Sequence, residues 1–318
     1  MKRKRTIRWL IGIVVITLTL NSLIGMFFYD LVIKRGPKEF LQNNEDLEVE
    51  PEILGEFLNG DWVTWTKNQD FETIQMSSYD DLTLSGYYLP ASEPSKKMVV
   101  FAHGYLGGAK DMGFFGKYYY EELGFNIFTP DFRGHGESEG DYYGFGWHDR
   151  LDLIDWLDLL IEKEGKDIEI VMHGLSMGAS AVLMASGEKL PEQVKLIVAD
   201  SPYTSVYDMF AYQMKRMYKL PDKPILPTLS LVTKLRANYS LSEASTINQI
   251  KKASKPILFI HGNEDNFVPT HMALKLSDAT KSNYEVLTIE GAGHGESYII
   301  EKETYQAKLK ENIERYLK

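Results

Sequence analysis

The most informative stretch of the sequence is residues 168–186, which read IEIVMHGLSMGASAVLMAS. Residues 168–172 form an apolar run typical of a strand buried in a parallel sheet, and residues 179–186 suit a helix. Between them, Gly174-Leu175-Ser176-Met177-Gly178 matches the pattern Gly-x-Ser-x-Gly. In that pattern a sharp turn from strand to helix, the nucleophile elbow, exposes a serine hydroxyl. We therefore predict that Ser176 is a nucleophile, with a non-catalytic glycine-rich turn as the alternative.

Further strand patterns occur at residues 71–76, 82–89, 98–102, 126–129, 196–199, 256–260 and 284–289. The first two alternate between polar and apolar residues across a short connection, which predicts an antiparallel hairpin. Helical patterns lie between most of the others, and the clearest is at residues 147–164. Strands that alternate with helices predict an α/β fold, a mostly parallel sheet with helices on both faces.

Residues 203–252 interrupt this alternation between the sixth and seventh strands. A structureless loop of this length is uncommon in a compact domain, so we predict a small helical cap inserted there. The segment contains a Met- and aromatic-rich stripe that includes Met209, Phe210 and Met214. These side chains either pack the cap onto the core or line an adaptable apolar acyl pocket.

A serine hydroxyl needs a base to act as a nucleophile, and in this motif an acid and then a histidine follow the serine along the chain. His294 follows the last strand within a Gly-Ala-Gly-His-Gly segment and is the candidate base. Asp265 follows the preceding strand and is the favoured acid, which would hold the imidazole in the required tautomer. Glu264 and Asp200 are reserve candidates for the acid.

Acyl transfer also requires backbone amides directed at the developing oxyanion. The amide of Met177 is one candidate, because Met177 follows the serine. The loop at residues 103–108, HGYLGG, follows a predicted strand and contributes the amide of Tyr105 as the other. We expect structural roles for His103, His135, His173 and His261, and surface positions for His148 and His271.

From about residue 70 to residue 318 the chain resembles the α/β-hydrolase superfamily. The resemblance rests on HGY at 103–105, DFRGHGES at 131–138, GLSMG at 174–178 and the loops that carry Asp265 and His294. Within the superfamily the chain looks like membrane-anchored bacterial esterases and relatives of serine peptidases. The resemblance implies the α/β-hydrolase fold. It departs from the His-Gly-Gly-Gly pattern of one group of lipases, because Tyr105 replaces a glycine.

The favoured function is hydrolysis of a carboxylic ester through an acyl-enzyme on Ser176, with a small-molecule or lipid-like ester as substrate. A peptidase or amidase with the same Ser-His-Asp triad is the alternative, because the triad serves both reactions. The third hypothesis is a non-catalytic, membrane-tethered binding protein. Dehalogenases and epoxide hydrolases of this fold would have Asp at position 176.

The N-terminus predicts a membrane anchor. Residues 1–8 carry five cations, and residues 9–28 are predominantly apolar, long enough to cross a bilayer. The positive-inside rule places residues 1–8 in the cytoplasm and the rest of the chain outside, as a single-pass protein of the cell membrane. Residues 23–28 read LIGMFF and lack the spaced pair of small residues of a cleavage site, so we favour an uncleaved signal anchor over a cleaved signal peptide.

Beyond this anchor, residues 29–65 read as a juxtamembrane linker with a lead-in helix, and residues 66–318 as the catalytic domain with its cap at about 203–252. The net charge of −10 argues against nucleic acid as a partner. The chain has no cysteine, which excludes disulfides and cysteine-ligated metals. We find no metal-binding constellation and no dinucleotide fingerprint, so we expect no cofactor and no metal. The sequence does not indicate an oligomeric state.

Overall fold

The computed structural model describes residues 2–41, 47 and 50–318. Its centre is an eight-stranded sheet with the order β1-β2-β4-β3-β5-β6-β7-β8. The strands are β1 Glu72–Ser77, β2 Thr83–Leu89, β3 Lys97–Ala102, β4 Asn126–Pro130, β5 Glu169–Leu175, β6 Val194–Asp200, β7 Ile257–Gly262 and β8 Tyr284–Ile289. The β1–β2 and β2–β4 pairs are antiparallel, and the remaining pairs are parallel. The predicted hairpin and mostly parallel sheet are confirmed.

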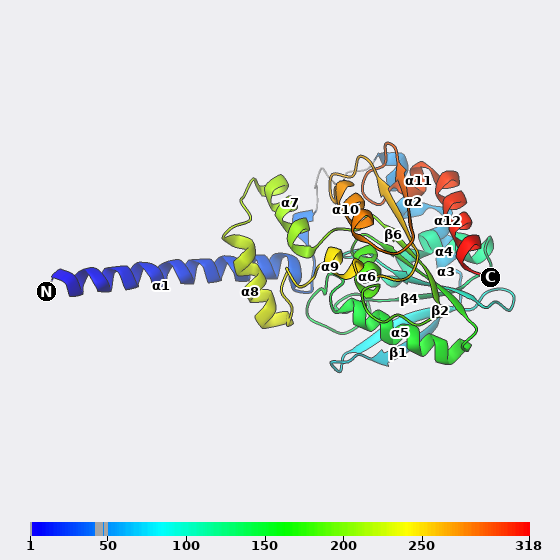
Figure 1. The fold of residues 1–318 in the computed structure, drawn as a ribbon, viewed down its shortest axis with the longest axis horizontal. Helices are drawn as coiled ribbons and strands as arrows, with labels where there is room; N and C mark the ends of the chain where they lie inside the picture. Colours follow the sequence, from blue (N-terminus) through cyan, green and yellow to red (C-terminus); the bar gives the residue numbers. More distant parts are fainter. Residues whose placement is uncertain (1, 42–46, 48–49) are drawn as a thin grey trace.

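Helices cover both faces of the sheet (Figure 1). Because side chains alternate along a strand, Met98 and Val100 of β3 belong to one buried cluster and Val99 and Phe101 to another. The first cluster includes residues of α5 Asp149–Glu164, α6 Met177–Ala185 and α10 His271–Ala279. The second includes residues of α3 Asp61–Lys67, α4 Gly113–Glu121, α11 Ser297–Ile300 and α12 Lys302–Tyr316.

The predicted helical cap is present between β6 and β7. It consists of α7 Val206–Tyr218, α8 Ile225–Ala237 and the short α9 Thr246–Ile250. The Ser205 hydroxyl accepts a hydrogen bond from the amide of Asp208 at 3.0 Å and so caps the N-terminus of α7. Both long cap helices end at a residue in the left-handed conformation, Lys219 after α7 and Asn238 after α8.

The N-terminal helix α1, Lys2–Phe28, extends away from the sheet domain (Figure 1). It continues into a π-helical turn at Tyr29–Ile33. By length and composition, Ile7–Ile33 is the one candidate membrane span in the described part of the chain. Cap helix α8 packs across α1 near Gly25. A Cβ atom on Gly25 would lie 2.7 Å from Thr228 Cγ2, so the glycine permits the close crossing of the two helices.

Residues 29–36 differ from the predicted linker, because they are bound to the catalytic domain. The amide of Tyr143 donates to the carbonyl of Ile33 at 2.8 Å, and the amide of Arg35 donates to the carbonyl of Asp141 at 2.7 Å. The Arg35 guanidinium also donates to the carbonyls of Ser138 and Gly136, both at 2.8 Å. Farther on, the structure has a 3₁₀ turn at Glu39–Leu41 and the helix α2 at Pro51–Asn59, followed by α3.

Candidate active site

Ser176 occupies a tight turn between β5 and α6. Its backbone has φ 55° and ψ −112°, a conformation that is unfavourable for a residue with a side chain. Its amide donates to the carbonyl of Asp200 in the neighbouring strand at 2.7 Å. Two glycines make the turn sterically feasible. A Cβ atom on Gly178 would lie 1.9 Å from the Ala102 carbonyl oxygen, and one on Gly174 would lie 2.3 Å from the Gly178 carbonyl oxygen.

The structure brings Ser176, His294 and Asp265 into one chain of hydrogen bonds. His294 Nε2 lies 2.9 Å from Ser176 Oγ, and His294 Nδ1 lies 2.7 Å from Asp265 Oδ2. In the neutral tautomer that this arrangement requires, the serine hydroxyl donates to Nε2, and Nδ1–H donates to the carboxylate. This is the geometry expected for a nucleophile, a general base and an acid that orients the base.

The Asp265 carboxylate is held by several donors. Its Oδ1 accepts the amides of Phe267 at 2.9 Å and Val268 at 2.8 Å, and its Oδ2 also lies 3.1 Å from His261 Nε2. Burial alone would raise the pKa of Asp265, but the facing His294 and the hydrogen bonds from both histidines hold that pKa well below its usual range. Asp265 is therefore ionised and fixed in orientation beside the imidazole.

The charge of Asp265 acts in turn on His294. Burial disfavours the imidazolium, but the attraction of the Asp265 carboxylate outweighs it and raises the pKa of His294 above its ordinary value of 6.5. Such a shift favours accepting a proton from the serine. It also means that the base is lost to protonation at a higher pH than for a free imidazole.

The reserve acid Asp200 has other partners. Its carboxylate accepts hydrogen bonds from the Ser201 hydroxyl at 2.9 Å and the Tyr305 hydroxyl at 3.1 Å. Complete burial raises the pKa of Asp200 to about 6. The other reserve, Glu264, is exposed to solvent. The structure thus brings Asp265, rather than either reserve, to the imidazole.

The two residues predicted to supply oxyanion amides lie beside Ser176. Met177 is the first residue of α6, where a helix leaves its amides without intrahelical partners. A Cβ atom on Gly104 would lie 3.8 Å from Ser176 Cβ, so the loop after β3 reaches the serine. Tyr105, Ser176 and Met177 line one pocket. These positions are compatible with the predicted roles of Tyr105 and Met177, which stay predictions.

The remaining histidines are mostly structural. His103 Nε2 lies 3.0 Å from the amide of Phe132, so it accepts that hydrogen bond and joins two loops. His173, beneath the serine turn, lies between the hydroxyls of Tyr119 and Tyr305, at 3.2 and 3.1 Å.

The prediction that His148 lies at the surface is wrong. His148 is buried, and its Nδ1 lies 2.7 Å from the Tyr142 hydroxyl. The ring of Tyr239, from the end of the cap, packs against it with centroids 5.4 Å apart. Burial lowers the pKa of His148 to about 4, so this histidine is neutral. The contact with the cap is a long-range one, which the local sequence does not indicate. His271 is exposed, as predicted.

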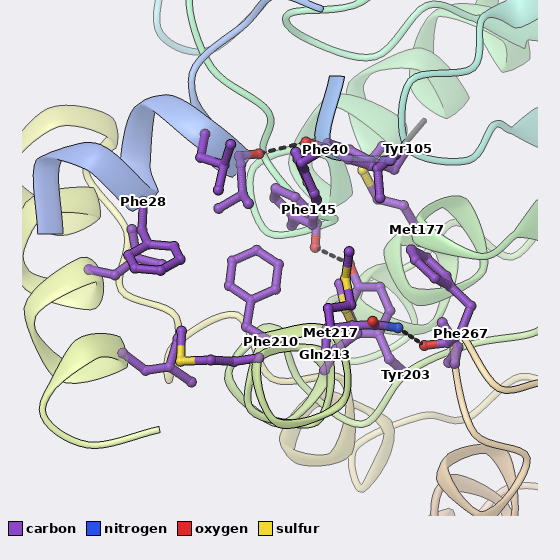
Figure 2. Close-up of a pocket in the computed structure, with 18 of the residues that line it drawn as sticks. Phe28, Phe40, Tyr105, Phe145, Met177, Tyr203, Phe210, Gln213, Met217 and Phe267 are labelled. Atoms are coloured by element: carbon purple, nitrogen blue, oxygen red, sulfur yellow. Dashed lines mark hydrogen bonds between the residues drawn. The ribbon is translucent and has the colours of Figure 1, made fainter. Parts of the chain in front are cut away.

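An apolar pocket, here called the cap pocket, runs from Ser176 beneath the cap helices (Figure 2). The predicted residues Met209, Phe210 and Met214 line it. Sequence reasoning missed several other lining residues, which are Phe28, Leu31, Val32, Phe145, Leu226, Leu229 and Phe267. The first three belong to the end of α1 and the π turn, where the sequence predicts a membrane span up to residue 28 and a linker after it. Figure 2 shows Phe28 and Phe210 on different elements around this pocket.

A second pocket also reaches the serine. Ser176, His294 and Gly104 line it together with Asp111 and several aromatic residues. Within the described part of the chain, no group of three or more His, Asp and Glu residues is arranged to hold a metal ion. The hydrogen bond between Ser176 and His294 supports nucleophilic chemistry centred on a serine that the two pockets share.

A family model described as the alpha/beta hydrolase family matches residues 99–305. The chain belongs to the α/β-hydrolase family. The matched region contains the serine turn and the loops that carry Asp265 and His294.

Curated relatives of this α/β-hydrolase include the uncharacterized protein YqkD of Bacillus subtilis, which is 28% identical over 77% of this chain and 82% of its own length. Protein bem46 of Schizosaccharomyces pombe is 26% identical over 64% of this chain and 63% of its own.

Solved structures of two enzymes resemble this α/β-hydrolase. The esterase Pf2001 of Pyrococcus furiosus superimposes with a TM-score of 0.63 at 25% identity and covers 80% of this chain and 96% of that one. The acylaminoacyl peptidase of Pyrococcus horikoshii has a TM-score of 0.60 at 19% identity and covers 80% of this chain and 43% of that one. Because the peptidase is only 19% identical, this similarity shows a shared fold and no more. Family membership and the likeness to the esterase Pf2001 support hydrolase activity.

Proposed function

We propose that this α/β-hydrolase cleaves carboxylic esters through an acyl-enzyme on Ser176. The observation that carries the proposal is the hydrogen-bonded chain from Ser176 through His294 to Asp265 at the inner end of the cap pocket. His294 Nε2 takes the hydroxyl proton as Ser176 Oγ attacks the ester carbonyl. The amides of Tyr105 and Met177 stabilise the resulting oxyanion.

The same groups complete the reaction. The tetrahedral intermediate collapses as His294 gives its proton to the departing alkoxide, which leaves as an alcohol. Water then attacks the acyl-enzyme, with His294 again taking the proton, and releases the carboxylic acid and free Ser176. The ionised Asp265 stabilises the imidazolium in both halves of the reaction.

The lining of the cap pocket favours an ester over a peptide substrate. None of the described residues that line it carries a charge, whereas an aminopeptidase needs a carboxylate to hold the substrate amine. Two cap carboxylates that could serve are engaged elsewhere. Glu243 pairs with Lys234 at 3.0 Å, and Asp208 accepts the Thr204 hydroxyl at 2.7 Å. Peptidase or amidase activity is the second candidate function, favoured by the fold shared with an acylaminoacyl peptidase.

For location, the proposal is a single-pass cell-membrane protein with its N-terminus in the cytoplasm and its catalytic domain outside. Five cations precede the apolar segment, which matches the positive-inside rule. The alternative, a cleaved signal peptide, would remove the Gly25 contact with α8 and the wall that Phe28 adds to the cap pocket. These contacts support retention of the helix as an anchor.

The nucleophile is tested by labelling the full chain with a fluorophosphonate probe. We expect labelling of the wild-type protein and of Ser92→Ala, which replaces an exposed serine, and none of Ser176→Ala. Labelling that persists in Ser176→Ala would contradict the assignment. The reaction class is tested with p-nitrophenyl butyrate beside aminoacyl p-nitroanilides. Hydrolysis of the anilides alone would favour the peptidase.

A further inference from the structure

We infer that the end of the N-terminal helix is a wall of the acyl-binding site, and that the cap pocket takes the long hydrocarbon chain of an ester drawn from the lipid layer that holds this helix. The inference rests on the proposed function and adds the substrate class, the direction of entry and the residues that select chain length.

The walls of the cap pocket come from three parts of the chain. Phe28, Leu31 and Val32 form one side, at the end of α1 and in the π turn. Met209, Phe210, Met214, Leu226 and Leu229 contribute from α7 and α8, and Ser176 and Met177 lie at the inner end. Figure 2 shows this arrangement, with Phe28 of α1 far from Met177 and Phe210 of α7 between them. An uncharged, largely apolar channel of this kind suits a hydrocarbon chain and excludes a polar head group.

The end of α1 is held in place against the catalytic loop. The Tyr105 hydroxyl donates to the carbonyl of Val32 at 2.8 Å, and the amide of Tyr143 donates to the carbonyl of Ile33 at 2.8 Å. Arg236 of α8 pairs with Asp30 at 3.3 Å. The backbone amide of Tyr105 is also a predicted oxyanion group, so a single residue joins the anchor to the site of chemistry. A flexible tether would make no such contacts.

The position at which α8 crosses the N-terminal helix indicates that the substrate enters from the lipid. Cap helix α8 crosses α1 at Gly25, three residues before the end of α1 and of the predicted span at Phe28. At ~1.5 Å per residue, the crossing is about 5 Å from that end of the helix. When α1 is inserted, α8 therefore lies at the boundary of the hydrocarbon layer. Two of its leucines suit this position, because Leu231 is 60% and Leu235 78% exposed.

The charge of the cap is complementary to a membrane surface. Residues 203–252 contain eight Lys and Arg residues and three Asp and Glu residues, while the whole chain has a net charge of −10. Lys215, Lys219, Lys223 and Lys234 are exposed. Basic side chains beside a membrane-embedded helix attract anionic head groups. The cap thus faces lipid beside the end of α1, which forms one wall of the pocket, and a lipid acyl chain has a short path to Ser176.

Chain-length selection by Leu31 provides the test. We compare p-nitrophenyl palmitate and p-nitrophenyl butyrate with the full-length protein in vesicles of phosphatidylcholine and phosphatidylglycerol. Leu31→Trp fills the cap pocket, so kcat/KM for palmitate should fall about tenfold while that for butyrate changes less than about twofold. Phe27→Trp is the matched control, because Phe27 is 62% exposed on the same helix and is not among the pocket residues. It should leave both values unchanged. If the ratio of kcat/KM for palmitate to kcat/KM for butyrate is the same in Leu31→Trp as in the wild type, because neither value falls or both fall equally, the inference is overturned.

A binding experiment separates this inference from the proposed function, since it needs no turnover. Full-length Ser176→Ala in the same vesicles is irradiated with a palmitoyl ester that carries a diazirine at the end of the chain. We expect cross-links within residues 25–35 and within α7, which Leu31→Trp reduces and Phe27→Trp leaves unchanged. Cross-links confined to residues 9–20, the part of α1 remote from the cap, would overturn the pocket assignment even if esters are hydrolysed. If cross-links occur as expected but no ester is cleaved, the proposed reaction fails and the acyl site stands.

Discussion

Among individual residues, Asp265 shows how one side chain can set the chemistry of another. Its carboxylate accepts hydrogen bonds from the amides of Phe267 and Val268. These bonds fix the Asp265 side chain in the one rotamer that faces His294. Its charge keeps the Nδ1–H of His294 directed at Oδ2 and leaves Nε2 free to accept the proton of Ser176. In the proposed reaction, the pKa of His294, raised by this contact, decides the pH at which the serine can be activated.

We predict that the pH dependence of kcat/KM reports this pair. His294 must be neutral to act as a base, so activity is present above its pKa and is lost as the pH falls through that value. Because the pKa is raised above 6.5, the midpoint of the acid limb should lie above 6.5. Asp265→Asn removes the carboxylate, so the midpoint should move to lower pH and kcat should fall by about 10⁴-fold.

The control for this prediction is Glu264→Gln, which neutralises the adjacent, exposed carboxylate. Its profile should match that of the wild type. A midpoint that stays in place in Asp265→Asn, or that shifts equally in Glu264→Gln, would show that Asp265 does not set the pKa of the base.

At the scale of elements, the turn between β5 and α6 depends on close contact with the end of β3. Gly178, in the first turn of α6, lies against the carbonyl of Ala102. This contact places the N-terminus of α6 beside the loop that carries Tyr105. A strained backbone at Ser176 is maintained because three neighbouring strands hold the turn, through the β3–β5 and β5–β6 pairings.

We predict that Gly178→Ala destabilises the fold and lowers activity together. The new Cβ would lie 1.9 Å from a backbone oxygen, which cannot rotate away as a side chain could. Over-packing of this kind costs about 1–3 kcal/mol, measured as a shift in the urea midpoint of the full chain in detergent. Gly55→Ala in α2 is the control, because a Cβ there meets nothing within 4 Å. It should be neutral or stabilising by up to about 1 kcal/mol. Equal stability of Gly178→Ala and wild type would contradict the close packing.

For the whole molecule, the main feature is that the N-terminal helix belongs both to the candidate membrane span and to the catalytic domain. Helix α1 extends far beyond the sheet domain in Figure 1, yet its end is bound to the loop at residues 136–143 and to α8. In the proposed location, such an arrangement would orient the cap toward the membrane instead of leaving the domain free to rotate on a linker.

The topology prediction can be tested with single-cysteine reporters, because the chain contains no cysteine of its own. In intact cells a membrane-impermeant maleimide should label Glu303→Cys, on the exposed surface of α12. Lys4→Cys, before the apolar segment, should be labelled only after permeabilisation. Labelling of both in intact cells, or of neither, would contradict a single span with the catalytic domain outside.

The sequence by itself determined the features that depend on local pattern. Runs of apolar residues predicted the strands, because a strand buried on both faces must be apolar along its length. The turn at Ser176 was predictable because its tight backbone requires glycine at positions 174 and 178. These two glycines and the serine form a short motif that can be recognised in the sequence. The long segment at residues 203–252 predicted a cap because an unstructured insertion of that size would be unfavourable.

Only the tertiary structure decided features that depend on distant contacts. The sequence favoured Asp265 over the reserve Asp200 as the acid, but only the fold places its carboxylate 2.7 Å from His294 Nδ1, because the two residues lie on separate loops. The fold also buried His148 beneath Tyr239 of the cap, and it made Phe28, Leu31 and Val32 part of the cap pocket. The physical reason is common to all three, because the partner of each side chain comes from a segment distant in the sequence. For the pocket residues, an apolar side chain has the same local pattern whether lipid, core or substrate covers it, and only the packing of distant segments determines which of these it meets.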